Sequence, residues 1–379
     1  MRVEIITPSA DPDRGGFGAR VHGLVSMFAR FADVRVVLTD GSTGARVPGV
    51  EYVPMSLPDG LRTRLQRMRT YYRVNFPRRT NGSPPDLVVI ESLDLLGLHQ
   101  YGPRVPWVLD EHNVYWNLLR YEMPNAPFFR GWLGRRRAVR GILMPRLLER
   151  AKRFEIDAIR GAARTMVTSD EDRKAVLAEC PDVGPVVHVM PNCVDVRRIP
   201  ALEEAVGSQT VVFVGDFNYV PNREASEFIT RFLAPGLPEA RLLLVGPNHP
   251  LGGLAPNVIA TGYVPDLTGV LRDSAVCIAP LAHGSGTRIK ILTYLAAARA
   301  VVATSKACEG LPLVDGRHLL IRDDPVAFRD AVAGLLRDPA GRRRLGLAGR
   351  ELVESTFDWQ VHVRALQDLA TEVCETRNA

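Results

Sequence analysis

Short apolar, β-branched runs alternate with amphipathic helical segments along almost the whole chain, and this rhythm constrains the fold more than any other feature. The first run, 2–7, is followed by helical spacing over 19–29 and by another apolar run at 34–38. Such alternation predicts parallel sheets with helices packed on both faces. The sequence therefore predicts an α/β protein.

The rhythm stops in a polar, poorly periodic stretch near 196–208 and restarts with the apolar run 210–214. A chain of 379 residues is long enough for two domains with separate cores. We expect a doubly wound domain at 1–200, a second at 208–356, and a closing helix at 357–379 that crosses back onto the first. Ligands of open α/β sheets bind outside the carboxyl ends of the strands, so we expect the two domains to face each other across a cleft.

The same criteria place the other elements. We expect further strands at 87–90, 107–109, 165–168, 186–189, 241–245, 258–260, 275–279, 300–303 and 319–321, and helices at 61–74, 135–159, 287–298, 324–336 and 340–353.

Composition narrows the class of protein. The chain is 46% hydrophobic and 24% charged, as globular proteins are, and no apolar stretch approaches the length of a membrane span. The first apolar run is interrupted by Arg2 and Glu4, so it does not resemble a secretory signal. The five cysteines are scattered and never at CxxC spacing, which favours neither a disulfide framework nor a zinc site. We expect a cytoplasmic protein.

The net charge of +6 is modest, but arginines cluster at 62–79 and at 130–140. Such clusters could meet an anionic membrane at its inner face, a phosphorylated acceptor or nucleic acid, or they could form an ordinary solvated surface. No helix-turn-helix, zinc-finger or aromatic RNA-binding pattern accompanies the charge. We therefore expect no nucleic-acid partner.

The most informative segment for function is 280–292 (PLAHGSGTRIKIL), where an apolar strand passes into a helix through small residues. Unpaired amides at a helix N-terminus and the positive end of the helix dipole favour an anion. The Gly-Ser-Gly sequence lets a ligand approach the backbone, and Arg288 and Lys290 add positive charge. The loop suits a diphosphate, although an ordinary strand-to-helix turn with two surface cations has the same features.

A second small-residue loop, 13–19, joins the first strand to the first helix. Its spacing after Gly16 and Gly18 ends in Val21 and does not complete the dinucleotide fingerprint, so NAD binding is not indicated.

Taken together and in order, eight segments resemble the nucleotide-sugar glycosyltransferases of the GT-B fold, in particular glycosyltransferase family 4, the group 1 glycosyltransferases. The segments are GGFG (15–18), LDEHNVYWNLLR (109–120), VTSDEDRKAV (167–176), MPNCVD (190–195), VGDFNYVPNREA (214–225), LLLVGP (242–247), GYVPDL (262–267) and PLAHGSGTRIKILTYLAAARAVVATSKACEGL (280–311).

The resemblance implies transfer of a sugar from a nucleoside diphosphate to an acceptor hydroxyl, with retention of configuration and without a cofactor or metal. It assigns Arg288 and Lys290 to the leaving diphosphate, where negative charge develops. It assigns His112 to a hydroxyl of the donor sugar; alternatively, His112 is an exposed residue at a helix start, with Asp110 or Asn113 as the cap. The donor-binding residues that it implies are Gly16, Tyr263, Val264, His283, Gly284, Ser285, Gly286, Thr287 and Thr293.

The chain departs from the family pattern at two places. Two glutamates eight positions apart are replaced by Ser285 and Thr293, and Thr293 offers one hydroxyl where relatives present a carboxylate to the ribose. A lysine common after the first strand of the second domain is missing from 216–219. A non-catalytic accessory protein and a nucleotide-sugar epimerase therefore stay open as alternatives. We expect the acceptor to be a glycan, a lipid-linked intermediate or a small natural product.

Overall fold

The computed structural model describes residues 1–12, 15–39, 44–55, 83–98, 105–125, 137–250, 252–283 and 289–375. The chain forms two compact units, Met1–Pro191 with His362–Ala379, and Asn192–Val361.

The first unit is built on a parallel sheet of seven strands in the order β3-β2-β1-β4-β5-β6-β7. Its strands are β1 (Arg2–Thr7), β2 (Asp33–Leu38), β3 (Glu51–Pro54), β4 (Leu87–Glu91), β5 (Trp107–Glu111), β6 (Arg164–Val167) and β7 (Val187–Val189). Its helices include α1 (Gly15–Phe28), α3 (Tyr115–Asn125), α5 (Arg137–Gly161) and α6 (Asp170–Glu179), with 3-10 turns η1 (Leu93–Leu98) and η3 (Pro181–Val183).

The direction of strand order reverses between β1 and β4, which pair in register from Val3↔Leu87 to Ile6↔Ile90. Every residue of β4 is buried, because a central parallel strand is covered on both faces. Such a reversal opens a crevice at the carboxyl ends of the two strands, where α/β sheets bind ligands. In this unit those ends are Thr7 and Glu91.

The end of the chain is fastened to the first unit. Helix α13 spans Trp359–Glu375, and its residues from His362 onward belong to this unit. Arg164 of β6 forms an ion pair with Glu372. The Cys374 thiol lies 3.7 Å from the carbonyl oxygen of Asp86.

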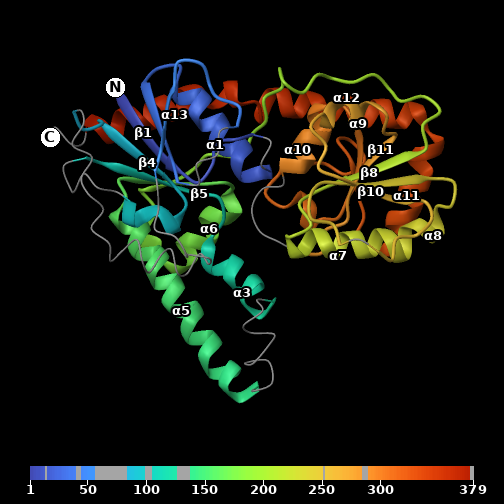
Figure 1. The fold of residues 1–379 in the computed structure, drawn as a ribbon, viewed down its shortest axis with the longest axis horizontal. Helices are drawn as coiled ribbons and strands as arrows, with labels where there is room; N and C mark the ends of the chain where they lie inside the picture. The colour runs from blue at the N-terminus through green and yellow to red at the C-terminus, as the bar shows by residue number, and fades with distance from the viewer. Residues whose placement is uncertain are drawn as a thin grey trace. The chain divides into compact units, whose positions relative to one another are not determined.

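The second unit contains a parallel sheet of six strands in the order β10-β9-β8-β11-β12-β13 (Figure 1). Its strands are β8 (Thr210–Val214), β9 (Arg241–Val245), β10 (Val258–Gly262), β11 (Val276–Ala279), β12 (Ala300–Ala303) and β13 (Leu320–Ile321). Its helices are α7 (Val220–Phe228), the π-helical η4 (Ile229–Leu233), α8 (Ala234–Gly236), α9 (Leu267–Arg272), α10 (Ile289–Ala296), the 3-10 turn η5 (Lys306–Cys308), α11 (Pro325–Arg337) and α12 (Pro339–Thr356). Helices α7 and α12 lie on opposite sides of these strands in Figure 1.

Two buried arginines tie the polar stretch before β8 to the second unit. The Arg299 guanidinium donates to the carbonyl oxygens of Leu202 and Glu203, each at 2.6 Å. Arg342 pairs with Glu204 at 2.6 Å. These contacts explain why residues from 192 onward pack with the second sheet.

Several expected elements differ from the structure. The edge strand β3 and the short helix α9 were not expected, because elements of four to six residues carry too little periodicity to be recognised. The helix expected at 61–74 lies outside the described residues.

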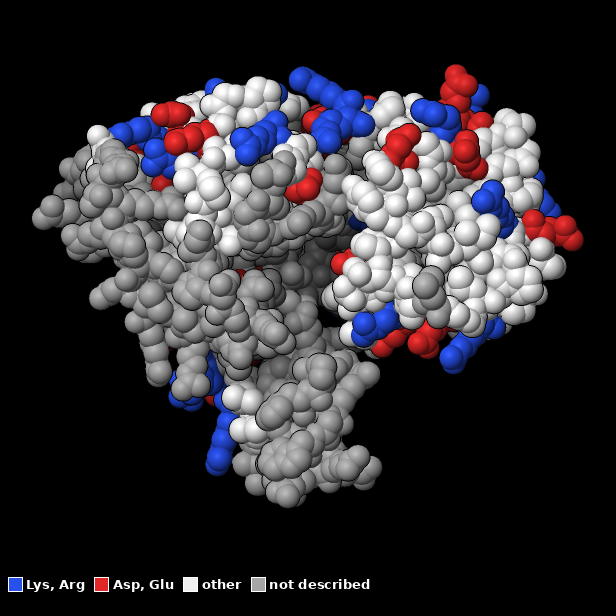
Figure 2. Space-filling model, in the orientation of Figure 1, with Lys and Arg blue, Asp and Glu red and all other residues white. Residues whose placement is uncertain are grey.

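The arginine cluster at 62–79 also lies outside the described residues, as do the side chains of the cluster at 130–140. On the face shown in Figure 2, described lysine and arginine side chains are interspersed with aspartate and glutamate. Among the described helices, none combines the length and the apolar character that crossing a membrane requires.

Candidate active site

In the second unit, the strand order reverses between β8 and β11, and several predicted site residues gather at the carboxyl ends of these strands. Lys290 lies in the first turn of α10, the helix that follows β11. His283 is exposed and follows the buried end of β11. The predicted residues between them, Gly284, Ser285, Gly286, Thr287 and Arg288, lie outside the described residues.

Lys290 is held by two neighbours from other elements. Its Nζ donates to Oδ1 of Asn222 in α7 at 2.7 Å. The same ammonium lies 4.2 Å from the ring centroid of Phe213 in β8, within cation–π range. These contacts fix a cation beside the N-terminus of α10, where the helix dipole already favours anions.

Asn222 is itself fixed by the turn after β8. Its Nδ2 donates to the carbonyl oxygen of Asp216 at 2.8 Å. A Cβ atom at Gly215 would lie 2.6 Å from that Nδ2, closer than real Cβ contacts allow. Glycine at position 215 is therefore required for Asn222 to reach Lys290.

The other residues of this turn bind one another. Asp216 Oδ1 accepts from Asn248 Nδ2 and from the Asn218 amide, each at 2.9 Å. Arg223 of α7 donates to the carbonyl oxygen of Asn218 at 3.2 Å. Arg223 therefore stabilises the turn in which relatives carry a lysine.

Thr293 directs its hydroxyl at its own helix. Its Oγ1 donates to the Ile289 carbonyl oxygen at 3.0 Å, a bond within α10. The next residue, Tyr294, is buried and accepts the Val214 amide of β8 at 2.7 Å. Thr293 in this arrangement offers no charged acceptor.

Tyr263 and Val264 follow β10, the outer strand of the sheet. The Tyr263 side chain is 54% exposed, so an aromatic face is available at this edge. Gly262 has φ +72° and accepts the Gly246 amide at 2.9 Å, which fixes the turn that presents Tyr263.

In the first unit, His112 lies at the carboxyl end of β5, beside the reversal between β1 and β4. Its ring stacks on Phe17 of α1, with centroids 4.3 Å apart and planes 14° from parallel. Its Nε2 lies 3.0 Å from Oε2 of Glu91 and 3.4 Å from Oδ2 of Asp110. Gly16, next to Phe17, is exposed at the start of α1.

Sequence reasoning missed the buried charges that surround His112. Arg20 of α1 is fully buried and makes a two-point ion pair with Asp110, with Nε–Oδ2 at 2.7 Å. Its Nη1 also donates to the carbonyl oxygen of Met190, at 2.9 Å. The sequence did contain an indication of this cluster, because the apolar strands β4 and β5 carry the charged residues Glu91 and Asp110 near their carboxyl ends.

The two carboxyl groups respond oppositely to this environment. Burial and the neighbouring Asp110 raise the pKa of Glu91 well above its usual value. Burial would also raise the pKa of Asp110, but its ion pair with Arg20 outweighs burial and holds that pKa below the usual range. The environment therefore favours the ionised form of Asp110 and the neutral form of Glu91.

A glutamate from another helix binds the first amides of α3. Glu155 of α5 accepts the amides of Tyr115 and Trp116 at 2.6 and 2.9 Å. Asp110 is a strand residue paired with Arg20, so it does not cap this helix. Burial raises the pKa of Glu155 to about 8 and, together with the neighbouring Glu155, raises that of Glu111 well above the usual value.

Glu91, Asp110 and His112 bring potential metal-ligand atoms within 4.8 Å of one another. Arg20, however, already occupies both oxygens of Asp110 and neutralises its charge. A divalent cation would lie against a guanidinium there, and we assign no metal to the cluster.

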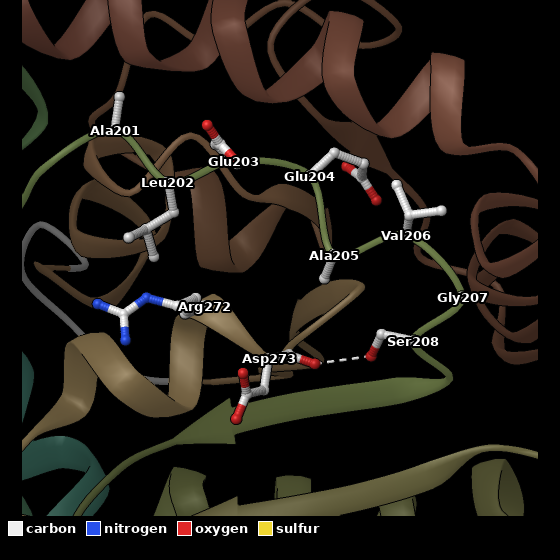
Figure 3. A pocket seen from close by; sticks show the side chains of 10 residues that line it. All are labelled: Ala201, Leu202, Glu203, Glu204, Ala205, Val206, Gly207, Ser208, Arg272 and Asp273. Carbon is white, nitrogen blue, oxygen red and sulfur yellow. Dashed lines mark hydrogen bonds between the residues drawn. The ribbon is translucent and has the colours of Figure 1, made fainter.

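A cavity of about 720 Å³ lies along 201–208, beside Arg272 and Asp273 (Figure 3). Ser208 donates to the carbonyl oxygen of Asp273 at 2.6 Å across it. These residues precede β8 and β11, so the cavity lies at the amino ends of the strands, away from Lys290.

Two doubly wound units with these strand orders define the GT-B fold, and solved structures agree. The chain is similar to sucrose-phosphate synthase from Thermosynechococcus elongatus, with a TM-score of 0.71 and 17% identity, covering 99% of this chain and 100% of that chain. It is similar to Anabaena HepE in complex with UDP and glucose, with a TM-score of 0.68 and 13% identity over 98% and 99% of the two chains. It is also similar to WaaG, a glycosyltransferase involved in lipopolysaccharide biosynthesis, with a TM-score of 0.64 and 15% identity over 97% and 99%.

Residues 208–338 match the family model described as "Glycosyl transferases group 1". Residues 208–338 are therefore similar to group 1 glycosyltransferases, and the chain has the GT-B fold, which confirms the resemblance seen in the sequence at that level. Assignment to family 4 stays a prediction. No protein with a curated description matches the chain in sequence.

Proposed function

We propose that the protein is a retaining glycosyltransferase that moves a sugar from a nucleoside diphosphate to an acceptor hydroxyl. The observation that carries the proposal is Lys290, an ammonium held by Asn222 and Phe213 at the N-terminus of α10 inside the group 1 domain. A fixed cation and a helix N-terminus together stabilise the charge that develops on a departing diphosphate.

In the proposed reaction, the bond between the anomeric carbon and the diphosphate oxygen breaks, and a bond from that carbon to the acceptor oxygen forms on the same face. The acceptor proton passes to the departing diphosphate, so no protein base and no metal are required. Lys290 and Arg288 bind the diphosphate, and His112 binds a hydroxyl of the sugar. Gly16, Tyr263, Val264 and His283 complete donor binding with the loop 284–287.

Relatives guide the choice of ligands. HepE is described with UDP and with glucose, which makes UDP and UDP-glucose the first ligands to test here. WaaG acts in lipopolysaccharide biosynthesis, which supports a glycan or lipid-linked acceptor at the inner membrane face over a small natural product.

The first test is a thermal-shift screen with UDP, GDP, TDP, ADP and CMP and their common sugar conjugates. We expect one nucleotide to raise the melting temperature, because a ligand of the folded state stabilises it by mass action. The Lys290→Ala variant should lose the shift and reduce turnover by orders of magnitude, whereas the exposed Lys174→Ala should change neither. An absence of any shift would instead favour the accessory-protein alternative, since Thr293 bonds within its own helix.

A further inference from the structure

The protonation of the cluster around His112 determines what this histidine can bind. Glu91 ends β4 and pairs in register with Asp110 on β5, and Arg20 reaches both from α1. All three side chains are fully buried. Among the described residues, the charged or titratable groups that act on Glu91 are Asp110, Arg20 and His112.

The charges in this cluster do not all balance. Arg20 and Asp110 neutralise each other through their two-point ion pair. Glu91 has no cation of its own, and its Oε1 has no hydrogen-bond partner in the described part of the structure. A buried, unpaired carboxylate is costly, so the stable form of Glu91 is the neutral acid, which hydrogen-bonds to Asp110.

The position of the imidazole identifies its protonated nitrogen. Nε2 faces Oε2 of Glu91 and, slightly further away, Oδ2 of Asp110. An ionised carboxylate only accepts hydrogen bonds, so a bare Nε2 lone pair would be repelled by Asp110. A proton on Nε2 faces acceptor oxygens of both carboxyl groups, so the distances favour Nε2–H as the donor to Glu91.

We propose that Glu91 is a positioning residue that works as a neutral acid and holds His112 as its uncharged Nε2–H tautomer. Phe17 fixes the ring plane by stacking. The ring then presents Nδ1 as its acceptor atom, which suits a sugar hydroxyl that donates. This last step rests on the proposed function; the protonation of Glu91 and the tautomer of His112 do not.

The decisive experiment is ¹⁵N NMR of protein with labelled histidine rings, with the His112 signal assigned from its loss in His112→Gln. At neutral pH we expect an uncharged ring protonated on Nε2. Glu91→Gln should preserve this tautomer, because a carboxamide both donates and accepts as the neutral acid does. Glu91→Ala should lose it, and the exposed Glu149→Gln should leave it unchanged.

A doubly protonated His112 at neutral pH would overturn the proposal, as would loss of the tautomer in Glu91→Gln. A Zn²⁺-dependent change in the wild-type His112 signal that Glu91→Gln lacks would also overturn it, since it would reveal a cation site. If Glu91→Ala does not fold, the wild type and Glu91→Gln decide the question.

Turnover provides a second readout. In the wild type, kcat should fall on the alkaline side as Glu91 loses its proton, because the buried carboxylate beside Asp110 then no longer holds His112 in the same position, and Glu91→Gln should lack this alkaline decline. An identical decline in both proteins would contradict the positioning role. Failure to find any sugar donor would refute the proposed function but leave the NMR result standing, so the two failures are distinguishable.

Discussion

At the scale of single residues, Asn222 is the side chain on which the position of the proposed diphosphate-binding cation depends. It links the turn after β8 to Lys290 through one acceptor oxygen. A hydrogen bond to a charged group contributes about 1.5–3 kcal/mol, so its loss changes an equilibrium by about 10- to 100-fold.

We therefore predict that Asn222→Ala lowers kcat/KM for the sugar donor by about tenfold or more, because the ammonium loses its fixed position. Steady-state kinetics with varied donor measures this. Arg223→Ala on the same helix is the matched control and should have a smaller effect, since Arg223 bonds only to the turn in the described contacts. Equal losses in both variants would mean that the whole turn, not Lys290, is being disturbed.

The site residues that the sequence predicted lie within single motifs, whereas those that it missed come from separate segments of the chain. Lys290 and His112 lie in contiguous motifs, so their positions at strand ends were predictable from local pattern. Arg20, Glu91 and Asp110 come from three segments that only the order β1-β4-β5 brings together. A lone buried charge in each apolar segment signals a partner but does not identify it.

At the scale of secondary-structure elements, the boundaries of the central strands were predicted most accurately. Strands β8, β9 and β12 begin and end where the sequence predicted, because central parallel strands are continuous apolar runs between polar turns. A helix after Asn113 was expected, but the contact of Glu155 with its first amides was not, since Glu155 lies forty residues away. Tertiary packing, not local sequence, determines that contact.

The buried carboxyl groups of Glu111 and Glu155 make the stability of the protein depend on pH. Because burial raises the pKa of Glu155 to about 8 and also raises that of Glu111 well above its usual value, the folded state binds more protons than the unfolded chain, in which glutamate titrates near 4.3. The free energy of unfolding should therefore fall as pH rises from about 4.3 to about 8, by up to about 1.4 kcal/mol per pH unit and proton.

Glu111→Gln should flatten this slope, because the carboxamide supplies the donor to Glu155 without titrating. Urea unfolding at a series of pH values, compared with Glu149→Gln on the exposed side of α5, would measure the difference. A slope that persists unchanged in Glu111→Gln would show that the pair does not hold the proton.

At the scale of the whole molecule, each unit has its own sheet and its own reversal of strand order, and the proposed contacts divide between them. Lys290 belongs to the unit that matches the group 1 domain, and His112 belongs to the other. If the nucleotide is bound mainly by the second unit, binding and sugar transfer should be separable by mutation.

We predict that His112→Ala keeps the thermal shift given by the nucleoside diphosphate alone but loses most of its turnover, because the proposed function places this histidine at the sugar and not at the nucleotide. Lys290→Ala should lose both. Parallel thermal-shift and turnover assays of the two variants with the same nucleotide test this division, with Lys174→Ala as the control for each. Loss of the nucleotide shift in His112→Ala to the same extent as in Lys290→Ala would show that the first unit contributes directly to nucleotide binding. His112, which buried carboxyl groups hold in place, would then bind the diphosphate rather than a sugar hydroxyl. The assignment of nucleotide binding to the second unit and sugar binding to the first would have to be revised.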